Sequence, residues 1–529
     1  MRRALILLFM LLPPSSWAQP GQWTGPDRSN ALESLVAVIA DAERHGLWPE
    51  NYHLDVLASA DAALVSAETD RLAEEAFRNF ARDLLTGRLD PHAIESQWPF
   101  DPRQGDVDTA LERALATGDV AAVLAGFEPA TPAYQALIRE RLFWLKQSDD
   151  DWPAVTTTRD HMELGDSGAD VDALRARLMQ MGRLQPMSPI VPVAAIPTGF
   201  ETIEGTPGFD AEVQAAVRNV QRLARIRPDG IVGPGTLAWI NRTPSQRAAT
   251  LRANLERLRW LPDEFGDRHI MVNVPDFTLQ VVEAGQVIRR HDVIVGRMSR
   301  PTPVLSATLA YMVVNPWWET PHRLAVNDEL PLFRRDPDAV ARLGFQILDR
   351  DGNVVDASTI DWTGVSRSNF PYRLRQAPGP LNALGVVKLI FPNPHSTFLH
   401  DTPGRQRFDE MPRALSSGCV RVRDAVDLAQ WVADASLAEP ADIAALVETR
   451  DESRLDVSEE IRVHFLYLTA FLNADGSVRM VHDLYDKDLT IITSMDRSHE
   501  DDQTRLRRPR PDRLHSARAR NGSDGHCPA

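Results

Sequence analysis

The spacing of apolar residues changes near residue 268, and this change does most to restrict the folds open to the chain. Before it, apolar residues such as Leu32, Leu35, Val36 and Ile39 recur at the spacing of an amphipathic helix. After it, short runs rich in Val, Ile and Phe, such as HIMVNV and FTLQVV, are typical of strands. The pattern predicts an α+β, multi-domain protein, and 529 residues suffice for three or four domains.

Two helical blocks are expected in the first half. Residues 29–148 predict a helical N-terminal scaffold domain, with Gly46 and Gly87 placed to end two of its helices. Residues 160–243 predict a small module of two short helices, the turn-forming run RPDGIVGPG, and a third short helix. A Pro-rich insertion, LQPMSPIVPVAAIP, separates the helices of this module. Neither block contains a cluster of catalytic side chains, so the chemistry is expected further along the chain.

Residues 268–448 predict a mainly-β domain that closes with a helix in DAVDLAQWVADA. Within it, 319–380 is too long for a simple connection, and Trp362, Phe370 and Tyr372 offer it apolar anchors. We interpret this segment as an insertion that folds over the neighbouring cleft as a lid, with a surface subdomain as the alternative. Beyond the domain, 459–492 predicts a hairpin packed back on it, and 495–529 has the composition of a disordered tail.

The N-terminus predicts export. Residues 1–18 combine a basic start, an apolar run and a small-residue cleavage pattern, as in a signal peptide, so we expect a mature chain beginning near Gln19 in the periplasm. An uncleaved anchor is the alternative, and no other stretch is long and apolar enough to span a membrane. With 2 cysteines in the chain, a disulfide scaffold is excluded. The net charge of −16 argues against nucleic acid or an anionic membrane as partner.

A single cysteine lies in the body of the chain, within LSSGCVRV. Cys419 follows Gly418, which permits a sharp turn, and the N–H groups around this turn are candidates for stabilising an oxyanion. A thiol nucleophile needs a base, and His400 at the end of STFLH is the better placed candidate. His395, in a loop-like context, is the alternative. One cysteine with scattered histidines is a poor zinc ligand set, so no metal is expected.

The segment HDTPGRQRFDEMPRALSSGCVRV resembles the active-site motif of the L,D-transpeptidases of the YkuD type. The runs RPTP, NPWWETP and GPLNALGVVKLIFPN are similar to the larger periplasmic branch of that family. The segment AAVRNVQRLARIRPDGIVGPGTLAWIN resembles the peptidoglycan-binding domain 1 family, although Val220 stands where that family usually has an aromatic residue. A helical spacer that no longer binds glycan is the alternative for this module.

The resemblance implies a role for each motif position. Cys419 corresponds to the nucleophile and His400 to its general acid/base. Asp401 would offer its backbone carbonyl to orient His400, where many relatives carry Gly or Ser. Ser417 and Gly418 occupy the oxyanion turn, and Arg421 would hold that turn or a substrate carboxylate.

The resemblance also implies an activity: cross-linking of peptidoglycan by acyl transfer from a tetrapeptide stem to an acceptor amine. An L,D-carboxypeptidase that hydrolyses the same thioester, and an inert peptidoglycan-binding scaffold, are the two alternatives. No cofactor is expected. The expected partners are peptidoglycan stem peptides, donor and acceptor, and neither the acceptor nor the oligomeric state follows from the sequence.

Overall fold

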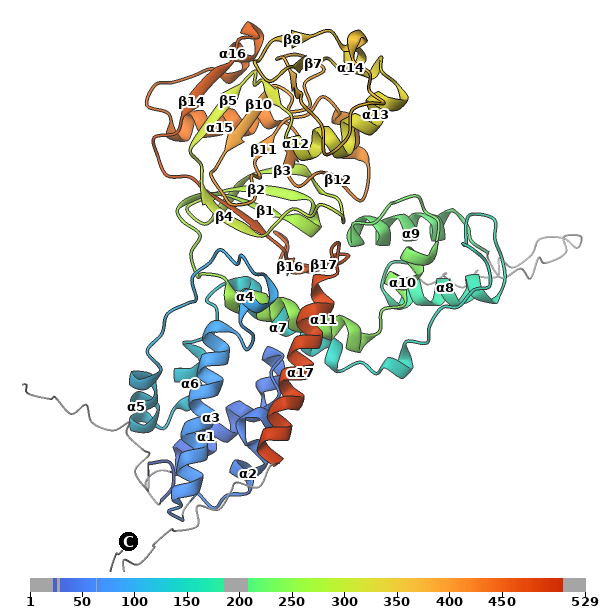
Figure 1. Ribbon diagram of the computed structural model, residues 1–529. Helices are drawn as coiled ribbons and strands as arrows, with labels where there is room; N and C mark the ends of the chain where they lie inside the picture. The colour runs from blue at the N-terminus through green and yellow to red at the C-terminus, as the bar shows by residue number, and fades with distance from the viewer. Residues whose placement is uncertain (1–21, 26–28, 63, 185–207, 508–529) are drawn as a thin grey trace, which may run out of the picture.

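The computed structural model describes residues 22–25, 29–62, 64–184 and 208–507. The predicted signal peptide, most of the Pro-rich insertion and Cys527 lie outside these residues. Three lobes are visible in Figure 1: a helical lobe at the bottom, a small helical lobe at the right and a β-rich lobe at the top. The architecture is the α+β, multi-domain arrangement that the sequence predicts.

The bottom lobe is a helical domain whose helices pack around one core of buried apolar residues. Gly46 and Gly87 end helical segments with positive φ angles of 75° and 84°. Ser66 caps the 20-residue helix α3 by accepting the N–H of Thr69 at 3.2 Å. The helices of this lobe are α1 (Ser29–Ala40), α2 (Leu54–Ser59), α3 (Ala67–Thr86), α4 (Pro91–Ile94), α5 (Val107–Thr117), α6 (Val120–Ala125) and α7 (Pro132–Leu145).

The small lobe at the right contains α8 (Ala169–Gln180), α9 (Ala211–Ala224) and α10 (Pro234–Ile240) around one apolar cluster. Gln221 on α9 fixes the RPDG turn. Its side-chain amide donates to Asp229 Oδ1 at 2.9 Å, and its Oε1 accepts the N–H of Gly230 at 2.8 Å. Gly230 has φ +79°, which glycine adopts without strain.

Helix α11 (Pro244–Trp260) connects the lobes and was not predicted. Its N-terminus carries a capping box formed by Thr243 and Gln246. The helix lies between the scaffold core and the β-rich core, so that even its charged residues are buried. Arg259 pairs with Glu256 at 2.5 Å, both fully buried, and also donates to the Tyr134 hydroxyl at 3.0 Å.

The top lobe is built on an 11-stranded mixed sheet in the order β14-β5-β10-β11-β13-β3-β2-β1-β15-β4, with β12 also paired to β3. Helix α15 (Ala425–Ser436), predicted from DAVDLAQWVADA, buries its apolar face in the core of this sheet. Helix α16 (Ile443–Thr449) follows it. The strands are β1 (Arg268–Asn273), β2 (Thr278–Glu283), β3 (Gln286–Gly296), β4 (Leu305–Thr308), β5 (Tyr311–Val314), β10 (Val387–Ile390), β11 (Leu399–His400), β12 (Ala414–Ser416), β13 (Val420–Val422), β14 (Ser453–Asp456) and β15 (Arg462–Leu466).

Residues 319–380 form a subdomain with its own sheet, in the order β6-β9-β7-β8, and its own apolar cluster around Phe333 and Trp362. Figure 1 shows it beside the main sheet at the upper right. Its elements are β6 (Trp318–Glu319), α12 (His322–Leu324), a π-helical turn (Ala325–Glu329), α13 (Leu330–Arg335), α14 (Ala339–Arg342), β7 (Phe345–Leu348), β8 (Val354–Val355) and β9 (Arg373–Gln376).

The C-terminal part differs from the sequence prediction. The segment expected to form a separate hairpin divides: β15 joins the main sheet, parallel to β1, and only β16 (Ala470–Leu472) and β17 (Val478–Met480) form a hairpin. The prediction of a disordered tail from 495 is wrong up to residue 507. Helix α17 (Lys487–Arg507) packs Ile491 and Met495 into the scaffold core, and Asp488 pairs with the buried Arg257 at 2.5 Å.

Candidate active site

The candidate site forms where β11 and β13 pair in parallel at the middle of the main sheet. His400 is in register with Arg421, and Cys419 directly precedes β13. Side chains two residues apart in a strand share a face, which brings the His400 and Cys419 side chains to the same side of the sheet. The charge of Arg421 lowers the pKa of both groups, in agreement with this placement.

The His400 ring is held in one tautomer. Its Nδ1 lies 2.6 Å from the backbone carbonyl oxygen of Asp401. A carbonyl oxygen only accepts, so Nδ1 carries the proton and Nε2 keeps its lone pair. The side chain is 5% exposed, and burial, with a contribution from Arg421, lowers its pKa to about 3. The ring is therefore neutral at physiological pH and able to accept a proton.

Cys419 carries a free, half-buried thiol. Burial raises its pKa above the ordinary value, a shift that the N–H of Phe398 and the charges of Arg421 and Arg323 oppose. Its Sγ lies 4.0 Å from the carbonyl oxygen of Ser396. Within the described residues, no hydrogen bond joins Sγ to the His400 ring. The resting pair is thus a neutral thiol and a neutral imidazole, and catalytic hydrogen bonds often tighten only when substrate binds.

The turn before the cysteine is fixed by Ser416 and Gly418. The Ser416 hydroxyl donates to the Cys419 carbonyl oxygen at 2.5 Å and accepts the Gly418 N–H at 3.1 Å. Gly418 has φ +121°, a conformation that side-chain-bearing residues rarely adopt. Because its N–H is already used, Gly418 shapes the turn but does not offer a free oxyanion donor. The Cys419 N–H, which has no partner among the described residues, is the better donor.

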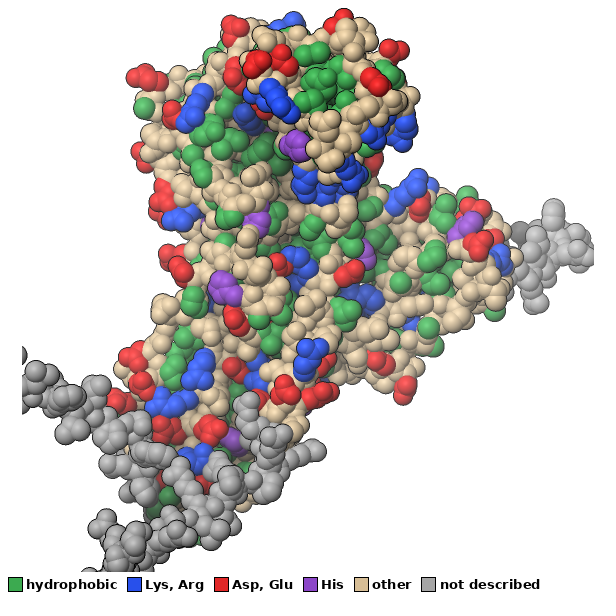
Figure 2. All heavy atoms as spheres, viewed as in Figure 1, with side chains coloured by type: hydrophobic (Ala, Val, Ile, Leu, Met, Phe, Trp, Pro, Cys, Tyr) green, Lys and Arg blue, Asp and Glu red, His purple; other side chains and the backbone are tan. Residues whose placement is uncertain are grey.

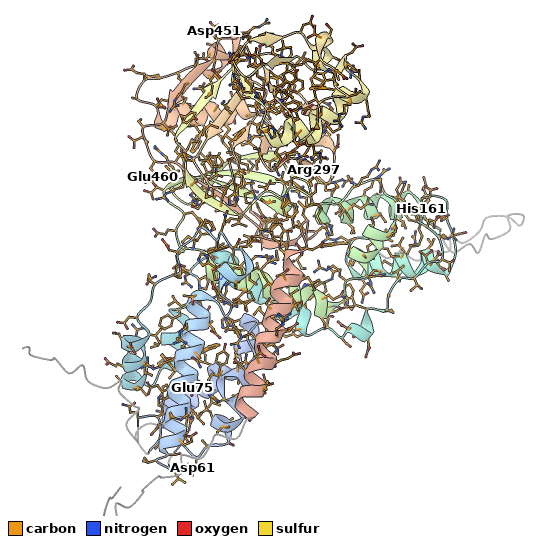
Figure 3. All side chains as sticks on the ribbon, viewed as in Figure 1. Asp61, Glu75, His161, Arg297, Asp451 and Glu460 are labelled. Carbon is orange, nitrogen blue, oxygen red and sulfur yellow. The ribbon has the colours of Figure 1, made fainter. Side chains whose placement is uncertain are left out.

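Ser417 faces a charged pair that links the turn to the inserted subdomain. Arg300 donates to the Ser417 hydroxyl at 3.0 Å. It also forms a bidentate ion pair with Asp328, in which Nη2 and Oδ1 are 2.8 Å apart. Arg297 adds a longer contact to the same carboxylate at 3.5 Å. Figure 3 labels Arg297 at the lower edge of the β-rich lobe, where Figure 2 shows blue side chains gathered.

Asp401 and Arg421 differ in how their polar groups are used. The Asp401 carboxylate is buried and accepts the N–H of Val386 at 3.0 Å, so it braces the loop before β10. Gly385, with φ +63°, lies so close to this carboxylate that a Cβ there would clash with it. In contrast, Arg421 Nε is buried without a hydrogen-bond partner among the described residues, and burial lowers the pKa of the guanidinium.

His395, the alternative base, lies on the loop before β11. Its backbone N–H donates to Asn393 Oδ1 at 3.1 Å, and Glu95 of the scaffold raises its pKa against the larger, lowering effect of burial. No contact to Cys419 is recorded for it among the described residues. The structure therefore groups Cys419, His400, Asp401 and Arg421 with the turn at Ser417 and Gly418, and leaves His395 outside this group.

Two supporting residues were missed by sequence reasoning. The Thr302 hydroxyl donates to the Gly418 carbonyl oxygen at 2.8 Å and accepts the Gly296 N–H at 2.8 Å. The Tyr485 hydroxyl donates to the Gly296 carbonyl oxygen at 2.6 Å and accepts the Thr302 N–H at 3.2 Å. Thr302 lies in the RPTP run, which was a usable signal, whereas no motif marks Tyr485.

Within the described ranges, no group of three or more His, Cys, Asp or Glu side chains is arranged to hold a metal ion. In the same ranges, every helix is too short or too polar to cross a bilayer.

The raised pKa of Cys419 predicts an alkaline profile for its alkylation. The rate of reaction with iodoacetamide should rise about tenfold per pH unit from pH 6 to pH 9, because only the thiolate reacts and its fraction grows with pH. Arg421→Gln should slow the reaction at each pH, since loss of the positive charge raises the pKa further. Rates that stay flat between pH 5 and pH 8 would instead indicate a preformed thiolate–imidazolium pair. Mass spectrometry of the alkylated peptide gives the rates.

Comparison with known proteins gives three family matches. Residues 267–445 match the model of the L,D-transpeptidase catalytic domain (YkuD). Residues 19–140 match a scaffold domain, and 167–240 match a family described as "Putative peptidoglycan binding domain". A curated protein of Haemophilus influenzae described as "Putative L,D-transpeptidase" is 39% identical over 242 residues, 46% of this chain and 48% of that protein. The match thus spans about half the length of the curated relative.

Two crystal structures of L,D-transpeptidases are also similar, each at 15% identity. The match to the protein of Xylanimonas cellulosilytica covers 59% of this chain and 100% of the solved chain, with a TM-score of 0.17. The match to the protein of Stackebrandtia nassauensis covers 58% of this chain and 97% of the solved chain, with a TM-score of 0.20. The family matches and the curated relative show that residues 267–445 belong to the L,D-transpeptidase catalytic-domain family, and that they follow segments matching the scaffold family and the putative peptidoglycan-binding family.

Proposed function

We propose that this chain is a cysteine acyltransferase that forms L,D cross-links between peptidoglycan stem peptides in the periplasm. The observation that carries the proposal is the His400 tautomer. With Nδ1 held by the Asp401 carbonyl, Nε2 keeps the lone pair that can take the thiol proton on the face that Cys419 shares. The family matches to catalytic and peptidoglycan-binding domains support association with the cell wall.

In the acylation step, Cys419 Sγ attacks the carbonyl carbon between the third residue and the terminal D-Ala of a tetrapeptide stem. His400 Nε2 takes the thiol proton as the S–C bond forms. The negative charge on the carbonyl oxygen is stabilised by the Cys419 N–H, a type of donor whose loss typically costs about 10²–10³ in rate. The C–N bond then breaks, His400 returns the proton to the departing amine, and D-Ala leaves.

In the transfer step, the side-chain amine of a neighbouring stem attacks the thioester carbon. His400 takes a proton from that amine as the new C–N bond forms. The C–S bond then breaks, and His400 returns the proton to the sulfur, which restores the thiol. The Arg421 guanidinium suits a carboxylate of the donor stem, since its charge acts on both reacting groups and no carboxylate of the described residues forms an ion pair with it. No metal ion or organic group is needed to balance either step.

Incubation of the purified chain with tetrapeptide muropeptides tests the proposal. Cross-linked dimers with release of one D-Ala per link are the expected products, identified by mass. Free tripeptides alone would identify the L,D-carboxypeptidase alternative, in which water attacks the thioester. Unchanged tetrapeptides would identify an inert, wall-binding scaffold.

The inserted subdomain, residues 319–380, is proposed to act as a lid that favours amine attack over hydrolysis by excluding water from the thioester. Two contacts support this role. Asp328 of the insertion pairs with Arg300, which also holds Ser417 in the cysteine turn. Arg323 of the insertion lies close enough for its charge to lower the pKa of Cys419.

Asp328→Asn should lower the ratio of dimer to tripeptide several-fold, because the substitution removes the charge that ties the insertion to Arg300. Cys419 should still acylate. Asp351→Asn, an exposed site in a turn of the same insertion, is the matched control and should leave the ratio unchanged. Chromatography of the products measures the ratio. If Asp328→Asn and the wild-type chain give the same ratio, the insertion is a surface subdomain and not a lid.

A further inference from the structure

The peptide group that joins Gly418 to Cys419 is anchored through its carbonyl oxygen. Its N–H, that of Cys419, is the better oxyanion donor of the turn, and its carbonyl oxygen accepts the Thr302 hydroxyl at 2.8 Å. A peptide group is planar and trans, so its C=O and N–H bonds point in opposite directions. A contact that fixes the direction of the Gly418 carbonyl therefore also fixes the direction in which the Cys419 N–H points.

The Thr302 hydroxyl has a defined direction. Its oxygen accepts the Gly296 N–H at 2.8 Å, and its single proton goes to the Gly418 carbonyl oxygen. Thr302 is 1% exposed, which leaves little room for water to compete for either contact. Hydrogen bonds in a chain polarise one another, so a carbonyl that accepts a hydrogen bond makes the N–H of the same peptide group a stronger donor.

Tyr485 holds Thr302 from outside the matched catalytic domain, which ends at residue 445. Its hydroxyl accepts the Thr302 N–H at 3.2 Å and donates to the Gly296 carbonyl oxygen at 2.6 Å. Burial raises the pKa of Tyr485 to about 12, so the hydroxyl keeps the proton that it donates. A Cβ at position 296 would lie only 2.7 Å from the Thr302 nitrogen, so this close approach requires glycine.

Tyr485 is itself fixed by the segment that leads into α17. Its backbone N–H donates to the Tyr467 hydroxyl at 2.7 Å, and the two rings stack with their centroids 5.6 Å apart. The Tyr467 hydroxyl in turn donates to Asp483 Oδ1 at 2.6 Å. The fold of the C-terminal segment therefore braces the hydroxyl that holds Thr302.

We propose that Thr302 and Tyr485 are positioning residues for acyl transfer, which orient the Gly418–Cys419 peptide group and strengthen its N–H as the oxyanion donor. Neither side chain has to touch the substrate. This inference rests on the proposed function, because an oxyanion forms in each step of that reaction. It also makes the segment after the matched catalytic domain part of the support of the active site.

Two reactions of Cys419 separate this role from a merely structural one. Acylation by a carbapenem, whose strained β-lactam amide is an acyl donor, passes through an oxyanion. Alkylation by iodoacetamide does not, since iodide leaves from a saturated carbon. Thr302→Val keeps the shape of the side chain and should slow acylation about tenfold, less than the loss of about 10²–10³ for a donor that is removed outright. Its alkylation rate should stay within about twofold of wild type from pH 6 to pH 9, because the thiol is unchanged.

Three further measurements sharpen the comparison. Thr302→Ser restores the hydroxyl and should recover most of the acylation rate. Tyr485→Phe removes only the outer hydroxyl and should slow acylation severalfold, again with normal alkylation. In infrared difference spectra, the thioester carbonyl band of acylated Thr302→Val should lie at higher frequency than in the wild-type chain, because a weaker donor polarises that bond less.

Thr308→Val and Tyr311→Phe are the matched controls and should acylate at the wild-type rate. They lie on β4 and β5, and neither side chain makes a recorded contact with the cysteine turn among the described residues.

Wild-type acylation in both Thr302→Val and Tyr485→Phe would overturn the inference and leave the proposed function intact. An equal loss of acylation and alkylation would also overturn it, since the hydroxyls would then serve only to hold the fold. If Thr302→Val does not fold, Tyr485→Phe decides between these outcomes alone. Failure of the wild-type chain to form dimers from muropeptides, with acylation still slowed in the variants, would instead overturn the proposed function alone.

Discussion

The wild-type chain should gain one covalent adduct on incubation with a carbapenem, and Cys419→Ala should gain none. The strained β-lactam amide is an acyl donor, and the Cys419 thiol is the only nucleophile placed beside both the His400 ring and the unpartnered Arg421 side chain within the described residues. Without sulfur at this position, no thioester can form. Intact-mass spectrometry after incubation with the carbapenem measures the adduct directly.

Two variants separate this result from other causes. Cys527→Ser removes the second cysteine and should keep the full adduct, because we expect Cys419 to react as a free thiol. Cys419→Ser retains the shape of the site and should give no adduct on the same time scale, because a hydroxyl is a far weaker nucleophile than a thiol. An adduct on Cys419→Ala would show that another side chain is acylated and would refute the assignment.

The sequence was most informative where regular structure depends on local spacing. The helical period of Leu32, Leu35 and Ile39 predicted the first helix, but α1 ends at Ala40, and Gly46 ends the short 3-10 turn that follows it. The apolar face of Leu428, Ala429 and Val432 predicted α15 equally well. In these segments the apolar stripe alone determines which side is buried, so periodicity is a sufficient guide.

Periodicity failed where charged residues are buried. Helix α11 buries Glu256, Arg257 and Arg259. Glu256 and Arg259 pair with each other within the helix, whereas the ion-pair partner of Arg257, Asp488, is distant in the sequence. Asp488 lies at the start of α17, which the sequence prediction placed in the 459–492 hairpin, and the residues of this helix from 495 onward were assigned to a disordered tail. Ion pairs over long sequence distances have no local signature, which explains why both helices were missed.

In the candidate site, too, the residues with a local sequence signal were predicted, and those that depend on distant contacts were not. Cys419 and His400 stood out because a thiol, a glycine turn and a histidine fall within one short segment. Thr302 and Tyr485 hold that turn from distant parts of the chain, through hydrogen bonds that only the assembled fold creates. The use of the Gly418 N–H by Ser416 was equally hidden, since it depends on the geometry of the turn. Residue types revealed the chemistry, and tertiary contacts determined how it is positioned.

His400→Ala should slow carbapenem acylation at pH 7 by a factor of about 10² to 10⁴, the usual range for a lost general base. The wild-type ring stays neutral above pH 3, because burial lowers its pKa to about 3, so it can accept the thiol proton throughout the physiological range. Without it, the buried thiol, whose pKa is raised, must lose its proton to solvent. Rapid-quench mass spectrometry measures the acylation rate.

The pH dependence distinguishes loss of a base from loss of structure. At pH 10, hydroxide generates the thiolate without His400, so iodoacetamide alkylation of His400→Ala should approach the wild-type rate. A collapsed site would stay slow at every pH. His395→Ala is the matched control and should acylate normally, because His395 makes no recorded contact with Cys419 within the described residues. If His395→Ala is the slow variant and His400→Ala is not, the base is His395, and His400 only braces the strand that leads to Asp401.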